Sequence, residues 1–172
     1  MNNSIIKDFT IRTTASITAG IILAFIFFIF KEKIYPLPDI NGRYHLIRTT
    51  QNSTSNKYID MQLTYEMLLR SEGNKIYGTA EKIKEVNKKE TINYIGKNRG
   101  HIVVNGYIEK NYLSDDRVVL LLQDDGKTRK FSHYYSLEVN EKTIRNKETI
   151  NGDFFSSVAN QSGVVSLYKL EK

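Results

Sequence analysis

Eighteen consecutive residues without a charged side chain divide this sequence into two parts that need different surroundings. The run is residues 13–30, TTASITAGIILAFIFFIF, and it lies between Arg12 and Lys31. As an α-helix it would be about 27 Å long, enough to cross a thin hydrocarbon core. The alternatives are a buried core helix and a secretory signal peptide, but the run ends in FFIFKEKIYP, without a small-residue cleavage site. The sequence therefore predicts an N-terminal tail at residues 1–12 and a transmembrane helix at residues 13–33.

Basic residues flank this predicted span on both sides and indicate its orientation. Lys7 and Arg12 precede it, and Lys31, Lys33 and Arg43 follow it. Under the positive-inside rule the side with more Lys and Arg is cytoplasmic. We therefore expect a single-pass protein of the cell inner membrane whose C-terminal domain is cytoplasmic.

Three small residues recur at every fourth position of the predicted span. Ser16, Gly20 and Ala24 would lie in one stripe of the helix, where a second helix backbone could approach closely within the lipid bilayer. The stripe is a candidate surface for self-association into a homo-oligomer. Chance is the alternative, because small residues are common in membrane spans.

The two prolines of the chain, Pro36 and Pro38, follow the span directly. Proline does not continue a helix and favours extended structure in the residue before it. Residues 34–39 are therefore predicted to be a short, stiff tether, and residues 40–172 a separate ligand-binding domain.

Strict alternation of apolar and polar residues dominates this second part. Between Tyr58 and Met67, every second residue is apolar, which is typical of a strand with one buried face. About eight short strands at hairpin spacing favour an all-β fold, a small antiparallel up-and-down β-barrel that leaves no open edge. The strand-like stretches are residues 44–48, 58–67, 75–80, 91–95, 101–108, 117–123, 130–139 and 164–170, and a turn is predicted at residues 161–163.

Glycines within these stretches support closure into a barrel. Gly78, Gly106 and Gly152 lie inside or at the start of strand-like runs, where glycine otherwise weakens a strand. Such positions suit bulges, barrel corners or the close approach of a ligand. The corner of a curved sheet is the simpler interpretation.

Motifs of catalysis are scarce. His45, His101 and His133 have no metal-ligand spacing, the chain has no Cys, and no GxSxG, GxGxxG or P-loop pattern occurs. We therefore expect neither an enzyme nor a metal or cofactor. The net charge of +6 is also too small for a DNA- or RNA-polymer-binding tail.

A small barrel can hold one small molecule in its interior or mouth. This one would supply tyrosines for stacking and basic residues for phosphate or carboxylate groups. Ordinary packing of strand tyrosines is the competing interpretation.

Several segments of the chain resemble a known family. They are NGRY at residues 41–44, IYGTA at 76–80, GYIEKNYLS at 106–114, GDFFSS at 152–157 and SGVVSL at 162–167, together with the membrane segment and its tether. The combination resembles the transmembrane β-barrel effectors of bacterial anti-phage signalling, which are the CD-NTase-associated effectors of CBASS systems. Typical members carry two membrane segments, whereas this chain has one convincing span.

The resemblance implies a barrel that binds a cyclic di- or oligonucleotide made during phage infection. Binding would drive oligomerisation, and the clustered helices would disrupt the inner membrane and kill the infected cell. A site for two phosphates and two bases needs cationic donors, aromatic rings and hydroxyls. The candidates are Tyr107, Arg117, Ser156 and Ser157, with Tyr44 and Tyr77 as weaker ones.

Two other classes of function stay open from the sequence. One is a signal-anchored extracytoplasmic barrel of lipocalin-like build, which would bind an apolar ligand or scaffold an envelope complex. The other is an enzyme that acts on lipid or nucleotide phosphate. Orientation separates the first from a cytosolic nucleotide receptor.

Overall fold

The computed structural model describes residues 3–34, 37–111, 114–125, 130–140, 143, 146 and 148–170. The chain divides into two compact units, one that ends at Pro36 and one that begins at Leu37. Residues 1–2 of the predicted tail, 35–36 of the predicted tether and 171–172 of the predicted domain lie outside the described residues, as does part of the 106–114 segment.

The first unit is one long helix, α1, which covers Asn3–Ile34. Its segment Lys7–Phe30 has 24 residues and contains an 18-residue window with a mean hydropathy of 2.2, none of which is buried within the structure. It has the length and composition of a single membrane span or a signal anchor. The helix begins well before residue 13, because the preceding residues continue it without a break.

Hydroxyl groups in this helix hydrogen-bond within it. The Oγ1 atoms of Thr13 and Thr18 each donate to the backbone carbonyl four residues earlier, at Phe9 and Thr14, over 2.9 Å. These bonds reduce the cost of placing the polar hydroxyls in hydrocarbon. The polar first half of the uncharged run is therefore compatible with an apolar environment.

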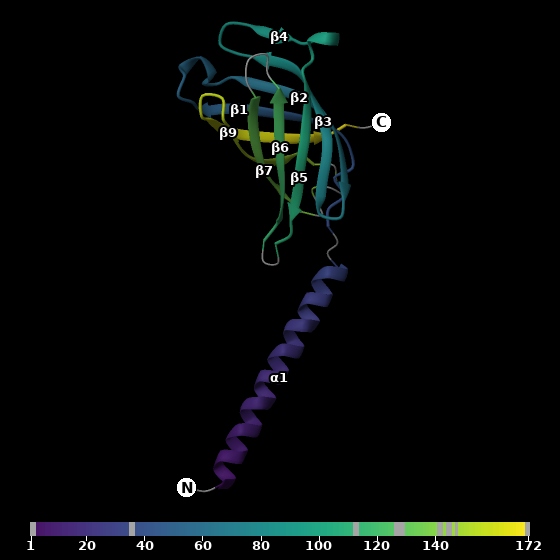
Figure 1. Cartoon of the computed structure of the whole chain (residues 1–172), viewed down its shortest axis with the longest axis vertical. Coiled ribbons are helices and arrows are strands. Elements are labelled where there is room, and N and C mark those ends of the chain that lie inside the picture. Colours follow the sequence, from purple (N-terminus) through teal and green to yellow (C-terminus); the bar gives the residue numbers. More distant parts are fainter. Residues whose placement is uncertain are drawn as a thin grey trace. The chain divides into compact units, whose positions relative to one another are not determined.

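The second unit is a closed antiparallel barrel of eight strands, which confirms the predicted fold (Figure 1). Neighbours along the chain pair with one another, and β9 returns to pair with β1, so the wall has no free edge. The barrel strands are β1 (Gly42–Asn52), β2 (Gln62–Glu72), β3 (Lys75–Val86), β5 (His101–Glu109), β6 (Asp116–Asp125), β7 (Lys130–Val139), β8 (Ile150–Ser156) and β9 (Gln161–Lys169).

Several details of the predicted strands are wrong. The stretch at residues 91–95 gives only β4 (Thr91–Asn93), which pairs with the end of β3 outside the barrel wall. The eighth wall strand is β8, which the alternation did not reveal because its inward positions include Gly152 and Ser156 rather than apolar residues throughout. The turn before β9 is at residues 157–160, so Gly163 belongs to a strand and not to a turn.

Short 3-10 helices interrupt two connections. η1 (Asn56–Tyr58) occupies the start of the predicted strand at residues 58–67, so that β2 begins at Gln62 instead. η2 (Gly96–Asn98) follows β4 and leads into β5. Both lie in the longer connections of the barrel.

Inward-facing residues alternate along each strand and fill the barrel. The core is apolar through most of its length, with Leu46, Ile76, Leu120 and Leu137 fully buried. At Gly152, a Cβ atom would overlap with the carbonyl oxygen of Ser136 and lie 2.8 Å from the Cα of Leu137. The glycine therefore permits the close approach of neighbouring strands that a small, strongly curved barrel requires.

Candidate functional site

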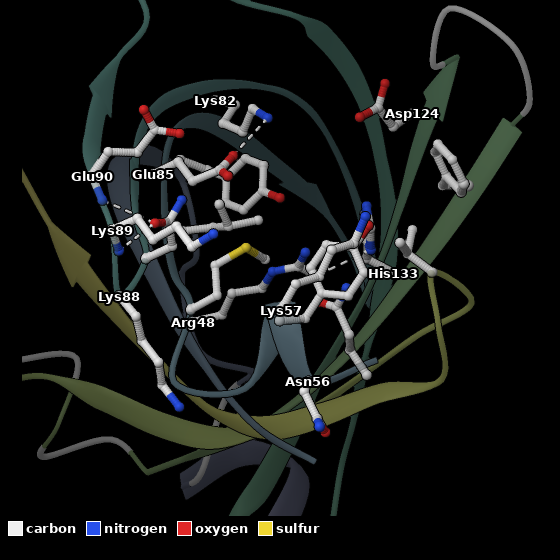
Figure 2. Close-up of a pocket in the computed structure, with 18 residues that line it drawn as sticks. Arg48, Asn56, Lys57, Lys82, Glu85, Lys88, Lys89, Glu90, Asp124 and His133 are labelled. Carbon is white, nitrogen blue, oxygen red and sulfur yellow. Dashed lines mark hydrogen bonds and ion pairs between the residues drawn. The ribbon is translucent and has the colours of Figure 1, made fainter. Parts of the chain in front are cut away.

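A cavity of about 720 Å³ opens at the end of the barrel where β1 ends and β2 begins. This volume falls in the range of small-molecule sites, about 300–1,000 Å³. Figure 2 shows the Arg48 side chain in the middle of it, with Glu85, Lys88 and Lys89 on one side and His133 on the other. The lining residues are Arg48, Asn56, Lys57, Tyr58, Met61, Leu63, Tyr65, Lys82, Glu85, Asn87, Lys88, Lys89, Glu90, Asp124, Phe131, His133, Val158 and Gln161.

Arg48 is a cation on the inward face of β1, the face on which Tyr44, Leu46 and Thr50 also lie. It is 2% exposed. Its Nη1 lies 3.1 Å from Nδ1 of His133 and 3.5 Å from the hydroxyl of Tyr135. A charged residue in the buried phase of a strand is the most unusual feature of the barrel interior, because ionised side chains are costly to bury.

Aromatic rings surround the guanidinium group. Its Cζ lies 4.9 Å from the ring centroid of Phe154 and 5.8 Å from that of Tyr65. Burial raises the pKa values of the Tyr65 and Tyr135 phenols, so both stay protonated at neutral pH. The electron-rich faces of these rings attract the guanidinium group, but the rings carry no negative charge that could neutralise it.

His133 holds Arg48 through an accepting nitrogen. A guanidinium donates only, so Nδ1 of His133 accepts the bond and the ring proton lies on Nε2. Burial, together with the charges of Arg48 and Lys82, lowers the pKa of His133 from 6.5 to about 3. The imidazole is therefore neutral across the physiological range.

Ser156 competes with Arg48 for that nitrogen. Its Oγ accepts the backbone N–H of Val158 at 3.1 Å and lies 2.8 Å from Nδ1 of His133. Because Ser156 is fully buried and the lowered pKa of His133 makes its imidazole a weak base, the pair suits positioning of Arg48 rather than activation of a serine nucleophile. Within the described part of the chain, no three metal-ligating side chains are grouped.

A β-bulge places opposite charges together on the wall of the cavity. In the pairing of β2 with β3, Tyr65 lies opposite Lys82 and Thr64 lies opposite Lys84, so one extra residue of β3 intervenes. The shift in phase lets both Lys82 and Glu85 line the cavity. Their side chains form an ion pair with an N–O distance of 3.4 Å, and Oε2 of Glu85 also accepts the Tyr94 hydroxyl at 2.9 Å.

One backbone carbonyl links the two connections at the rim of the cavity, between β1 and β2 and between β8 and β9. The oxygen of Ala159 accepts from the hydroxyls of Ser53 and Thr54 at 3.0 and 2.9 Å, and from the backbone N–H of Thr54 at 2.9 Å. Ala159, Asn160 and Asp60 are non-glycine residues with positive φ, at 50°, 45° and 64°. The backbone strain identified in the described chain thus lies in the two connections that border the cavity.

The residues predicted from the sequence lie mostly away from this cavity. Tyr77 and Tyr107 are on the outer face of the barrel, 44% and 46% exposed. Arg117 also faces outward, with its Nη1 3.8 Å from a carboxylate oxygen of Glu109. The strand register makes Tyr77 and Tyr107, and Tyr107 and Arg117, diagonal neighbours on this outer face, which is not the face that lines the cavity.

The other three predicted residues lie inside or at the rim. Tyr44 is buried in the core, where burial together with Asp39 raises the pKa of its phenol to about 12. Ser156 contacts His133 as described, and Ser157 is an exposed residue whose Oγ accepts the backbone N–H of Ser132 at 3.1 Å. Ser156 is thus the one of the six that belongs to the polar cluster around Arg48.

Arg48, Lys82, Glu85 and His133 were not among the predicted site residues. The sequence could have indicated Arg48, because this charged residue follows Tyr44 and Leu46 at the alternate positions that are expected to face the core. His133 likewise interrupts an apolar series, formed by Phe131, Tyr135, Leu137 and Val139, whereas Lys82 and Glu85 carry no comparable signal. Lys82 and Glu85 are three residues apart, which on a regular strand would put them on opposite faces.

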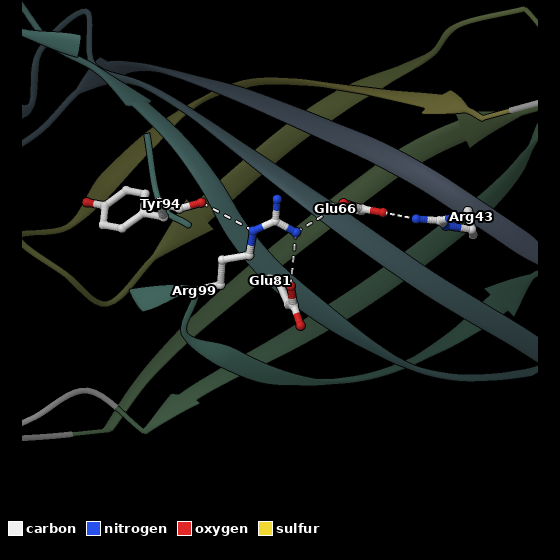
Figure 3. Close-up of polar contacts among 5 residues, drawn as sticks. All are labelled: Arg43, Glu66, Glu81, Tyr94 and Arg99. Carbon is white, nitrogen blue, oxygen red and sulfur yellow. Dashed lines mark hydrogen bonds and ion pairs between the residues drawn. The ribbon is translucent and has the colours of Figure 1, made fainter. Parts of the chain in front are cut away.

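A second polar cluster lies on the outer wall (Figure 3) and is linked to the cavity lining through Tyr94, whose hydroxyl donates to Glu85. Nη1 of Arg99 lies 3.5 Å from Glu66 and 3.4 Å from Glu81, and its Nε donates to the carbonyl of Tyr94 at 3.2 Å. Glu66 also pairs with Arg43, and this hydrogen bond lowers the pKa of the Glu66 carboxyl. The cluster fastens the connection that contains β4 and η2 to strands β2 and β3.

No family model and no curated protein matches this chain. Its function is therefore inferred from the site itself.

Proposed function

We propose that this protein is a membrane-anchored receptor whose barrel binds a cyclic di- or oligonucleotide in the mouth cavity. The observation that carries the proposal is the composition of that cavity. It has five basic residues against three acidic ones, and aromatic rings at Tyr58, Tyr65 and Phe131. Basic donors suit phosphodiester groups and aromatic faces suit bases.

The size and position of the cavity fit the same class of ligand. At about 720 Å³ it can enclose a molecule of two nucleotides rather than a polymer, and it opens at one end of a closed wall. Lys57 and Lys88 are exposed residues of the rim, and Lys88 forms an exposed ion pair with Asp60. The long stem of lysine would let both ammonium groups follow phosphates of different spacing.

The membrane helix supplies the output of the proposed receptor. Ligand binding would favour association of several copies, with Ser16, Gly20 and Ala24 at the contact between helices. Gly20 has no Cβ atom, so a second helix backbone could approach closely at this position. Clustered spans would then disrupt the inner membrane of an infected cell, as in the family that the sequence resembles.

Binding to the full chain in lipid nanodiscs tests the proposal directly. Cyclic di-AMP, cyclic di-GMP and cyclic tri-AMP are titrated by calorimetry, and association is followed by chemical cross-linking. We expect saturable binding of at least one of them, weaker at high salt, together with larger cross-linked species. Absence of binding by all three would contradict the proposal.

A blocked cavity provides a matched comparison. Val158→Trp puts an indole into the cavity lining, whereas Val164→Trp makes the same change at an exposed position of β9. The first variant should lose binding and the second should retain it. Equal binding by both would mean that the ligand site lies elsewhere.

One observation favours a second candidate function. Met61, Leu63, Phe131 and Val158 give part of the cavity an apolar wall, which suits the tail of an amphipathic ligand. This is the extracytoplasmic barrel with an apolar ligand. A reporter fused to the C-terminus separates the two, because alkaline phosphatase is active only outside the cytoplasm, whereas a nucleotide receptor must face the cytoplasm.

A further inference from the structure

Arg48 has more donors than the protein satisfies. A guanidinium carries five N–H groups in a planar fork. Nη1 faces His133 and Tyr135, but the Nε of Arg48 is buried without a hydrogen-bond partner, the one such side-chain atom found among the described residues. A buried N–H group without an acceptor destabilises the folded state, and such groups are rare in native structures.

The charge of Arg48 also lacks a direct counter-ion in the described chain. Glu85 interacts with it electrostatically, but the Oε2 of Glu85 already accepts from Lys82 and Tyr94. The groups in hydrogen-bond contact with Arg48 are a neutral imidazole and a protonated phenol. A buried cation that meets only neutral partners is unusual, because removing a charge from water is costly unless it is paired.

The side chain is nevertheless held firmly. His133 and Tyr135 hold Nη1, Phe154 stacks near the guanidinium, and Ser156 orients the imidazole of His133. A structural role would explain these contacts but not the unpartnered Nε. An arginine that is positioned on one side and left without an acceptor on the other is organised for a partner that the protein does not supply.

We propose that Arg48 anchors an oxyanion of the ligand, a phosphate or carboxylate group that accepts from its Nε–H and an adjacent Nη–H. This inference rests on the proposed function in that it uses the same cavity, but it names the chemistry that the site recognises. Two parallel N–H bonds to two oxygens match the fork of guanidinium, so the anchor is specific for planar or tetrahedral oxyanions. Lys82, which lines the same cavity from β3, would add a second positive charge.

The test uses nuclear magnetic resonance on the full chain in nanodiscs, with the Arg48 Nε–H signal assigned from its loss in Arg48→Lys. Cyclic di-AMP and cyclic di-GMP are the phosphodiester probes, and octanoate is the carboxylate probe. We expect at least one probe to shift the Arg48 signal in a saturable way. A signal that no probe moves would overturn the anchor, whether or not the variants fold.

Affinity measurements by calorimetry then compare Arg48→Met with Arg117→Met. Met retains the length and apolar stem of Arg without its charge, and Arg117 is the exposed arginine that the sequence had suggested. Loss of a charge-assisted bidentate contact should weaken binding by about 10- to 100-fold in Arg48→Met. Arg117→Met should bind as the wild type does.

Thermal stability without ligand distinguishes an anchor from a structural residue. Because Met removes a buried charge that lacks a counter-ion, the melting temperature of unliganded Arg48→Met should be equal to or above that of the wild type. A variant that melts lower and still binds the probe at wild-type affinity would show that Arg48 serves the fold alone.

The failure of this inference and the failure of the proposed function give different results. A cyclic dinucleotide that binds Arg48→Met and wild type equally would overturn the anchor and retain the receptor. Octanoate binding that depends on Arg48, with no nucleotide binding, would retain the anchor and replace the receptor by the second candidate. Nucleotide binding that depends on Arg48 supports both.

Discussion

Arg48 and His133 are 85 residues apart in the chain, and Nη1 of one lies 3.1 Å from Nδ1 of the other. Their strands, β1 and β7, are not neighbours in the wall, since β9 and β8 lie between them. The contact therefore crosses the interior of the barrel. It makes the polarity of the cavity depend on closure of the whole wall and on the protonation state of one imidazole.

That dependence predicts a loss of stability in mild acid. The pKa of His133 is lowered from 6.5 to about 3, so between these values the unfolded chain binds a proton that the folded chain does not. The free energy of unfolding should therefore fall as the pH drops from 6.5 towards 3, at up to about 1.4 kcal/mol per pH unit from this residue. Urea unfolding at a series of pH values from neutral down to about pH 4 measures it.

A pair of histidine variants isolates this contribution from the carboxylates that titrate over the same range. His133→Gln should show a shallower dependence on pH than the wild type. His101→Gln, which changes an exposed residue of β5, should follow the wild type. Parallel curves for wild type and His133→Gln would argue against a neutral, buried His133.

Gly152 should be intolerant of any side chain. An added Cβ would overlap with the carbonyl oxygen of Ser136 on β7, and a backbone atom cannot move aside without disturbing the pairing of β7 with β8. We expect Gly152→Ala to lower the free energy of unfolding by about 1–3 kcal/mol or more, as overpacking does. At Gly100 nothing lies within 4 Å, so Gly100→Ala should change it by about 0.5 kcal/mol or less. Similar denaturation midpoints for the two variants would contradict this account of barrel curvature.

Arg99 should control local motion more than global stability. Its contacts with Glu66, Glu81 and the carbonyl of Tyr94 are partly exposed, so Arg99→Met should change the free energy of unfolding by about 0–1 kcal/mol. Hydrogen exchange should nevertheless accelerate at the Tyr94 amide, which donates to the Ile83 carbonyl at 2.9 Å.

The matched change for Arg99 is Arg117→Met, which removes an exposed pair with Glu109 on the same barrel. It should leave exchange at Tyr94 unaltered. If Arg99→Met does so as well, the outer cluster does not fasten the connection around β4.

Gly20 should matter for association of the membrane helix and not for folding of the barrel. Gly20→Leu places a branched side chain in the stripe with Ser16 and Ala24, which obstructs close approach of a second helix. We expect weaker cross-linking in membranes, with barrel unfolding unchanged. Ile22→Leu, a conservative change at another exposed position of α1, serves as the comparison. Undiminished cross-linking of Gly20→Leu would remove the stripe from the proposed mechanism.

Local patterns in the sequence were sufficient for the class of fold. Period-two alternation reports which residues share a face of a strand, so β7 was predicted at its observed bounds and the closed meander followed from strand number and spacing. The alternation was uninformative for β8, because small and polar residues occupy inward positions there. A strand whose buried face is not apolar lacks the signal on which such predictions depend.

The sequence by itself determined a long uncharged helix and a curved all-β domain, because helix length, alternation and strand glycines are local properties. The tertiary structure decided the site. Arg48 meets His133 only after the barrel closes, and the bulge in β3 rather than regular alternation turns both Lys82 and Glu85 into the cavity. Tyr107 and Arg117 face outward. The sequence alone did not distinguish them from cavity-lining residues, because the folded barrel decides which face of each strand points inward.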